Sequence, residues 1–142
     1  MILVAWIAIL ATGLFTGGSL FCTLVEHPAR LDAGSEVALR QWLPSYKRAT
    51  RLQASLALVG AVAALLDGVF GTGGGTSIVS GLLLASVIPF TLLVVFPVNR
   101  QLEEPHRLGS DPGTLTLLQS WGRLQAMRTA LALAAFLLLV MG

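Results

Sequence analysis

Four long segments of this chain contain few or no charged residues, and this feature constrains its fold more than any other. The segments cover about residues 2–25, 46–66, 77–98 and 114–140. A helix needs about 20 mostly apolar residues to cross the hydrocarbon core of a bilayer. In the third segment we expect a kink near Pro89, because proline cannot donate a helical hydrogen bond. The pattern predicts an all-α, integral membrane four-helix bundle, built as a single four-helix transmembrane domain over residues 1–142.

The composition indicates a protein that is embedded mostly in a lipid bilayer. Hydrophobic residues make up 55% and charged residues only 11%, whereas a soluble domain carries about 25% charged residues. This argues against a soluble enzyme, and also against a disordered or nucleic-acid-binding chain, which would need a higher charge. The single cysteine, Cys22, excludes an intrachain disulfide and a metal site with several thiolate ligands. We therefore expect a lipid bilayer as partner and no nucleic acid.

Basic residues are distributed unevenly between the connections. All 9 Lys and Arg residues lie in or beside residues 26–51 and 100–113, and none lies between the second and third segments. Positive charge favours the cytoplasmic side, so the sequence predicts a multi-pass protein of the cell membrane with loops 26–51 and 100–113 cytoplasmic and both termini on the outer side. Within the first loop we expect a short amphipathic helix, Ser35–Trp42, with Val37, Leu39 and Trp42 available to the membrane interface.

Polar residues lie at regular spacing in the fourth segment. Trp121, Gln125 and Arg128 follow an i, i+4, i+7 pattern, which places them on one face of a helix. An arginine deep in lipid costs at least about 2.5 kcal/mol, so Arg128 should face the bundle interior and pair with a partner. Glu26 is the expected partner, and Asn99 can add a carbonyl oxygen.

Polar groups also mark the ends of the first and second segments. Proline continues a helix poorly, so we expect the first span to end at the stretch Glu26–Arg30. Tyr46 and Arg48 would enter the second helix on the same side of the membrane. All four helices would then bring polar groups to the cytoplasmic half, an arrangement that is either a functional site or a polar clamp between helices. The 2 histidines lie in different loops, so we expect no metal site.

Four short motifs occur in order along the chain: Glu26-His27-Pro28-Ala29-Arg30, Trp42-Leu43-Pro44-Ser45-Tyr46-Lys47-Arg48, Pro97-Val98-Asn99-Arg100-Gln101-Leu102 and Trp121 through Arg128. With these motifs the chain resembles the anthrone oxygenase-like family, a four-span membrane domain of unknown function that includes the anthrone oxygenases. The resemblance implies the oxidation of anthrones to anthraquinones without a metal or flavin cofactor. Many relatives have a histidine at the position of Gln125, which can hydrogen-bond but cannot carry a proton.

The resemblance and the residue chemistry together define a candidate site. The expected catalytic residues are Glu26 or His27 as base, since imidazole titrates near neutral pH, and Arg128 as the group that holds the substrate anion. The expected substrate-binding residues are Arg30, Tyr46, Arg48, Asn99, Trp121 and Gln125.

Two functions remain open at this point. One is an oxygenase-like enzyme that oxidises a lipophilic aromatic or quinol-like substrate. It predicts an enclosed pocket lined by His27, Tyr46, Trp121 and Arg128. The other is a non-catalytic small subunit or scaffold that packs on a larger membrane complex or forms a homo-oligomer. It predicts that the same groups bond to one another without a void.

Overall fold

The computed structural model describes residues 1–142 and contains helices but no strand. The first helix consists of α1 (Ile2–Phe21), a π-helical turn η1 (Cys22–Glu26) and α2 (His27–Asp32). The second is α3 (Ser35–Phe70), the third consists of α4 (Gly74–Phe90), a π-helical turn η2 (Thr91–Val95) and α5 (Phe96–Leu102), and the fourth is α6 (Pro112–Met141). All 4 are long and apolar enough to cross a membrane, which confirms the predicted all-α fold with four membrane-spanning helices.

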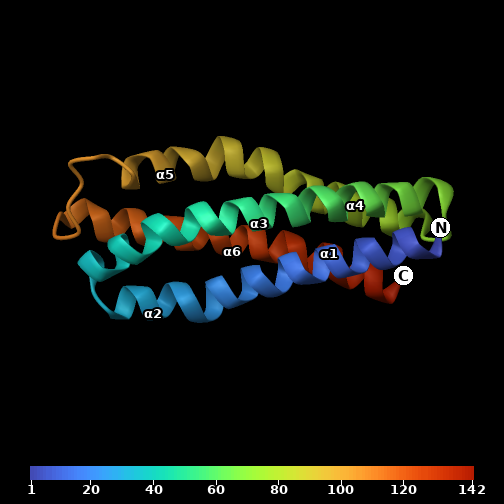
Figure 1. Ribbon diagram of the computed structural model, residues 1–142, viewed down its shortest axis with the longest axis horizontal. Coiled ribbons are helices and arrows are strands. Elements are labelled where there is room, and N and C mark those ends of the chain that lie inside the picture. Colours follow the sequence, from blue (N-terminus) through green and yellow to red (C-terminus); the bar gives the residue numbers. More distant parts are fainter.

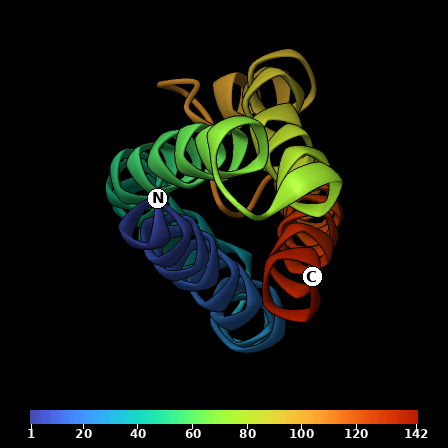
Figure 2. The same ribbon diagram turned by 90° about the vertical axis from the view of Figure 1, so that its right-hand side faces the viewer.

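The four helices alternate in direction and form a closed ring. α1 packs against α3 and α6, and α4 packs against the same two helices from the other side. Figure 2 shows this ring along its axis. Both termini and the turn of residues 71–73 lie at one end, which we call the terminus end; residues 33–34 and 103–111 lie at the opposite, loop end (Figure 1). The two basic connections of the sequence therefore lie at the same end of the bundle.

The two halves of the bundle have different cores. Toward the terminus end, alanines such as Ala57 and Ala132 pack around Phe15 and Leu84. A Cβ at Gly60 would lie 2.8 Å from Leu84 and 2.9 Å from Thr12, so the glycine permits close helix packing. Toward the loop end, larger side chains fill the core, namely Leu39, Trp42, Val95, Leu102, Leu118 and Trp121.

The expected interfacial helix Ser35–Trp42 is wrong. These residues form the first turns of α3, which continues without a break to Phe70. Leu39 is 5% exposed and Trp42 is fully buried, so only Val37 faces outward. The physical reason is the length of α3: its 36 residues span about 54 Å, whereas the hydrocarbon core is about 30 Å thick. The loop end extends well beyond that thickness and has its own aromatic core.

Both π-helical turns precede a proline. η1 ends two residues before Pro28, and η2 ends two residues before Pro97. A π-helical turn shifts the register of the backbone hydrogen bonds, so a proline that follows it removes fewer of the helix's hydrogen bonds. For this reason the first helix does not end at Pro28, as the sequence suggested, but continues through α2. The kink expected near Pro89 stays a prediction: α4 continues through this proline to Phe90, and η2 begins two residues after it.

The second π-helical turn coincides with a change in packing. α3 packs along α4, but no comparable contact joins α3 to η2 or α5, and Figure 1 shows α5 standing apart from α3 at the loop end. A groove lies between α3 and α5 at this point, and it is lined by Tyr46, Lys47, Thr50, Arg51, Phe96, Asn99, Arg100 and Glu103.

Exposed charges define how far a bilayer can reach along the bundle. The exposed basic residues furthest toward the terminus end are Arg51 on α3, Arg100 on α5 and Arg123 on α6. Beyond them the side chains on the outside of the four helices are uncharged to the terminus end, and many are large and apolar. The terminus-side half of the bundle therefore suits the hydrocarbon core, and the loop end suits the headgroup region and the adjoining water.

Candidate functional site

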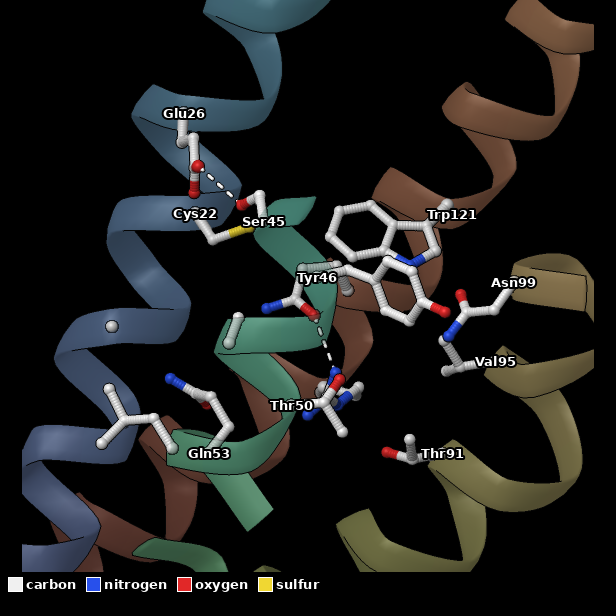
Figure 3. A pocket seen from close by; sticks show the side chains of 15 residues that line it. Cys22, Glu26, Ser45, Tyr46, Thr50, Gln53, Thr91, Val95, Asn99 and Trp121 are labelled. Atoms are coloured by element: carbon white, nitrogen blue, oxygen red, sulfur yellow. Dashed lines mark hydrogen bonds between the residues drawn. The ribbon is translucent and has the colours of Figure 1, made fainter. Parts of the chain in front are cut away.

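A cavity of about 190 Å³ lies in the loop half of the bundle, among all four helices. Each helix contributes polar side chains to its wall, and the two π-helical turns border it from opposite sides. Figure 3 shows Glu26 and Ser45 toward the loop end, Tyr46, Trp121 and Asn99 midway, and Gln53 and Thr91 deepest. The other polar lining residues are Cys22, Thr50, Gln125 and Arg128.

Arg128 brings a positive charge to this cavity without an anionic partner. Its Nη1 donates a hydrogen bond to Gln125 Oε1 at 3.0 Å, and its guanidinium carbon lies 6.0 Å from the centre of the Phe15 ring. The Nε atom is buried and has no hydrogen-bond partner. The helix face predicted for Trp121, Gln125 and Arg128 is therefore present, and all three residues line the cavity.

The predicted pairing of Arg128 with Glu26 is wrong. Glu26 instead pairs with Arg30 at 3.2 Å, four residues further along the same helix. The helix continues past Pro28, so Arg30 lies on the same face one turn away and reaches the carboxylate first. Arg128 therefore has a donor, Nε, from which no other residue of the protein accepts a hydrogen bond.

The Glu26 carboxylate is held through one of its two oxygens. Oε1 accepts hydrogen bonds from Gln41 Nε2 at 2.9 Å and from Ser45 Oγ at 3.0 Å, and it is also the atom that faces Arg30. None of these three contacts uses Oε2. The carboxylate is thus fixed in place at the cavity wall (Figure 3), and Gln41, Ser45 and Arg30 leave its Oε2 atom free.

His27 lies outside the cavity and joins two helices. Its Nε2 lies 2.9 Å from the carbonyl oxygen of Leu118 on α6, and its Nδ1 lies 3.0 Å from Nη1 of Arg30. Arginine can only donate, so Nδ1 is the acceptor and Nε2 carries the proton that is donated to Leu118. The ring also packs against Trp121, with 4.9 Å between ring centres. With both nitrogens engaged and 5% of the residue exposed, His27 has no free atom for a base.

The packing of His27 requires a glycine opposite it. A Cβ at Gly122 on α6 would lie 2.6 Å from His27 Cδ2 and 2.7 Å from Nε2. We expect Gly122→Ala to destabilise the protein by about 1–3 kcal/mol, the usual cost of overpacking, measured as a lower midpoint of thermal unfolding in detergent. Gly113→Ala on the same helix is the control, because its nearest neighbour would lie 3.8 Å away. Equal midpoints for the two variants would contradict this role of Gly122.

An aromatic wall supports the loop side of the cavity. Trp42 stacks on Tyr46 with 4.2 Å between ring centres, and Trp42 meets Trp121 edge-on at 5.9 Å. The buried Trp42 therefore holds in place the two rings that line the cavity. Asn99 contributes from the opposite wall: it is 5% exposed, and its Oδ1 has no hydrogen-bond partner. The cavity thus presents a hydrogen-bond acceptor as well as a cation.

Two of the predicted binding residues do not line the cavity. Arg48 is exposed on α3, and Arg30 is buried behind Glu26, where it also donates to Gln41 and lies 5.7 Å from the Trp121 ring centre. Sequence reasoning also missed lining residues, namely Cys22, Ser45, Thr50, Gln53 and Thr91. Gln53 and Thr91 could have been predicted from the sequence, because uncharged polar side chains in apolar spans tend to face the interior of the bundle. No three His, Cys, Asp or Glu side chains come together in a group that could hold a metal ion.

The fold and the site define a multi-pass helical membrane protein with a polar cavity among its helices. The chain belongs to the anthrone oxygenase family, whose model matches residues 42–138, more than half of its length. This confirms the resemblance seen in the motifs. Tyr46, Asn99, Trp121 and Arg128 lie within the match, whereas Glu26, His27 and Arg30 precede it. Neither the comparison with curated proteins nor that with solved structures finds a significant match.

Proposed function

We propose that this protein oxidises a lipophilic aromatic carbon acid of the hydroxyanthrone class with molecular oxygen, in the cavity around Arg128. The observation that carries the proposal is the buried guanidinium of Arg128, which lines the cavity and has no acidic partner. An unpaired charge in a low-dielectric site is costly. An anionic substrate oxygen would compensate it, and an enolate or phenolate is the anion that an anthrone forms.

The reaction balances without a further reactant. A base removes one proton from the methylene carbon of the anthrone. The carbanion that remains transfers electrons to O₂ and bonds to it, and the base returns the proton to the outer oxygen to give a hydroperoxide. Loss of water from this hydroperoxide leaves a carbonyl. One oxygen atom enters the quinone, and the other leaves as water with both methylene hydrogens. The protein has to supply a base, a site for the oxyanion and a surface for a flat ring.

The cavity residues can be assigned to these tasks. Glu26 is the proposed base, through the Oε2 atom that Gln41, Ser45 and Arg30 leave free, while Arg128 stabilises the oxyanion. Asn99 Oδ1 accepts a hydrogen bond from a substrate hydroxyl, and Tyr46 and Trp121 pack on the ring. Gln125 positions the Arg128 guanidinium rather than moving a proton. His27, whose nitrogens are both occupied, holds α2 against α6.

A non-catalytic subunit or scaffold is the second candidate. It is favoured by the bonded group of His27, Arg30 and Leu118, which joins two helices as a clamp would. The clamp does not extend to Arg128 and Asn99, which face a void instead of each other.

The two candidate functions differ in whether the protein turns over a substrate. We expect purified protein in nanodiscs to convert 1,8-dihydroxyanthrone to the quinone faster than empty nanodiscs do, followed by absorbance. A rate equal to that of empty nanodiscs would favour the scaffold.

The orientation in the membrane is part of this proposal. The two basic connections share the loop end, so the loop end should be cytoplasmic and both termini should be outside. We expect a cysteine placed at exposed Ser110 to resist a membrane-impermeant maleimide in intact cells, and one at exposed Thr72 to react. The parent chain's Cys22, which is partly buried, should be replaced by serine first. The reverse labelling pattern would contradict the proposed orientation.

A further inference from the structure

An apolar slot leads from the outer surface of the bundle toward Arg128. It lies between α3 and the α4–η2 stretch and has a volume of about 100 Å³. Its rim includes Ala54, Ile88 and Leu92, which are exposed on the side that faces lipid. Its inner end includes Phe15 of α1 and Arg128 of α6, so the slot reaches from the membrane-facing surface to the centre of the bundle.

The slot and the polar cavity adjoin each other. Thr50, Gln53, Thr91 and Arg128 line both. A molecule bound to Arg128 can therefore extend into the polar cavity on one side and into the slot on the other. α3 and η2 share far fewer close backbone contacts than α3 and α4, and the slot lies at this boundary.

The two compartments differ in chemistry. The cavity offers the carboxylate of Glu26, the amide of Asn99 and the phenol of Tyr46. The slot offers mostly apolar walls, among them Ala57, Val87 and Phe96. A ligand complementary to both has an oxygen-bearing aromatic head and an apolar extension, because burying a polar group in the slot without a hydrogen bond would be unfavourable.

We propose that the substrate carries an aliphatic side chain that lies in this slot, with its oxygenated ring system in the cavity beside Arg128. The inference rests on the proposed function and adds a substrate class to it. It also gives the path of entry. The substrate arrives from the bilayer between α3 and η2, and its aliphatic side chain stays on the side of the lipid.

Binding of two stable probes separates the slot from the rest of the site. The probes are 1-hydroxyanthraquinone and a derivative with a pentyl chain, titrated against protein in nanodiscs by their absorbance. Ala54→Trp should fill the rim of the slot and weaken binding of the pentyl compound at least about tenfold, while binding of the parent compound changes less than about twofold. Leu92→Trp should act in the same way from the opposite rim.

Leu58→Trp is the matched control, because Leu58 is 56% exposed on the same helix and does not line the slot. It should leave both affinities unchanged. Equal weakening of both compounds by Ala54→Trp and Leu92→Trp, or no weakening of either, would overturn the slot assignment. Arg128→Leu tests the proposed function separately and should weaken both compounds. If wild-type protein and Arg128→Leu bind the two probes equally well, the proposed function is contradicted, whatever the result for the slot variants.

Discussion

Replacing Arg128 by leucine should lower the rate of anthrone oxidation about 10²–10³-fold, the range found when one donor to a developing oxyanion is removed. The guanidinium lines the cavity with a buried Nε that no protein group uses, and Gln125 is its one hydrogen-bond partner. Leucine removes the charge that stabilises the enolate and leaves an apolar side chain beside Phe15 at the inner end of the slot. Initial rates of quinone formation in nanodiscs measure the effect.

Two further arginines serve as controls for this experiment. Arg123→Leu changes an exposed residue on the same helix, and Arg107→Leu changes a residue of the 103–111 connection that pairs with Glu104. Both should retain more than about half of the wild-type rate, as expected for groups remote from the chemistry. Arg128→Lys should be intermediate, since it keeps the charge but loses the planar set of donors. Equal, small effects of all these substitutions would contradict the role of Arg128.

Glu26→Gln should lower the rate about 10²–10⁴-fold, the usual contribution of a general base. Glutamine keeps the size of the side chain and an acceptor oxygen for Ser45 and Gln41 but removes the ion pair with Arg30, so the unfolding midpoint is measured beside the rate. The loss should appear in kcat rather than in the affinity for hydroxyanthraquinone, because the carboxylate acts on a carbon-bound proton. Turnover and product binding measured on the same preparation give this comparison.

His27→Asn distinguishes the two candidate bases of the sequence. His27 bonds to the Leu118 carbonyl and to Arg30 and does not line the cavity. Its replacement should lower the unfolding midpoint and leave kcat within about tenfold, because a positioning group outside the cavity affects the rate indirectly. If Glu26→Gln is active and His27→Asn is inactive at unchanged stability, the base assignment is wrong.

The architecture followed from the sequence because lipid imposes a simple requirement. Each span must be a long apolar helix with its backbone hydrogen bonds satisfied internally, so hydropathy alone identified the four helices. The spacing of Trp121, Gln125 and Arg128 likewise placed them on one inward face, and the structure has all three at the cavity. These features depend on local pattern, which a single sequence carries.

The features that were not foreseen depend on contacts between helices. The π-helical turn η1 lets the chain pass Pro28 as a helix, which places Arg30 beside Glu26 and leaves Arg128 unpaired. Trp42 looked like an interfacial residue because the sequence does not reveal that the loop end has a core of its own. The occupation of both His27 nitrogens depends on Leu118, 91 positions away in the chain. The spacing of residues in the sequence does not predict such a contact.

The role proposed for Arg128 is to bind the anionic oxygen of a lipophilic aromatic within the bundle. The absorption spectrum of 1-hydroxyanthraquinone tests this role when the compound is bound to wild-type protein and to Arg128→Leu in nanodiscs, at a pH where the free compound is a neutral phenol. We expect the red-shifted spectrum of the phenolate on wild-type protein and the spectrum of the neutral phenol with the variant. The same neutral spectrum with both proteins would contradict it.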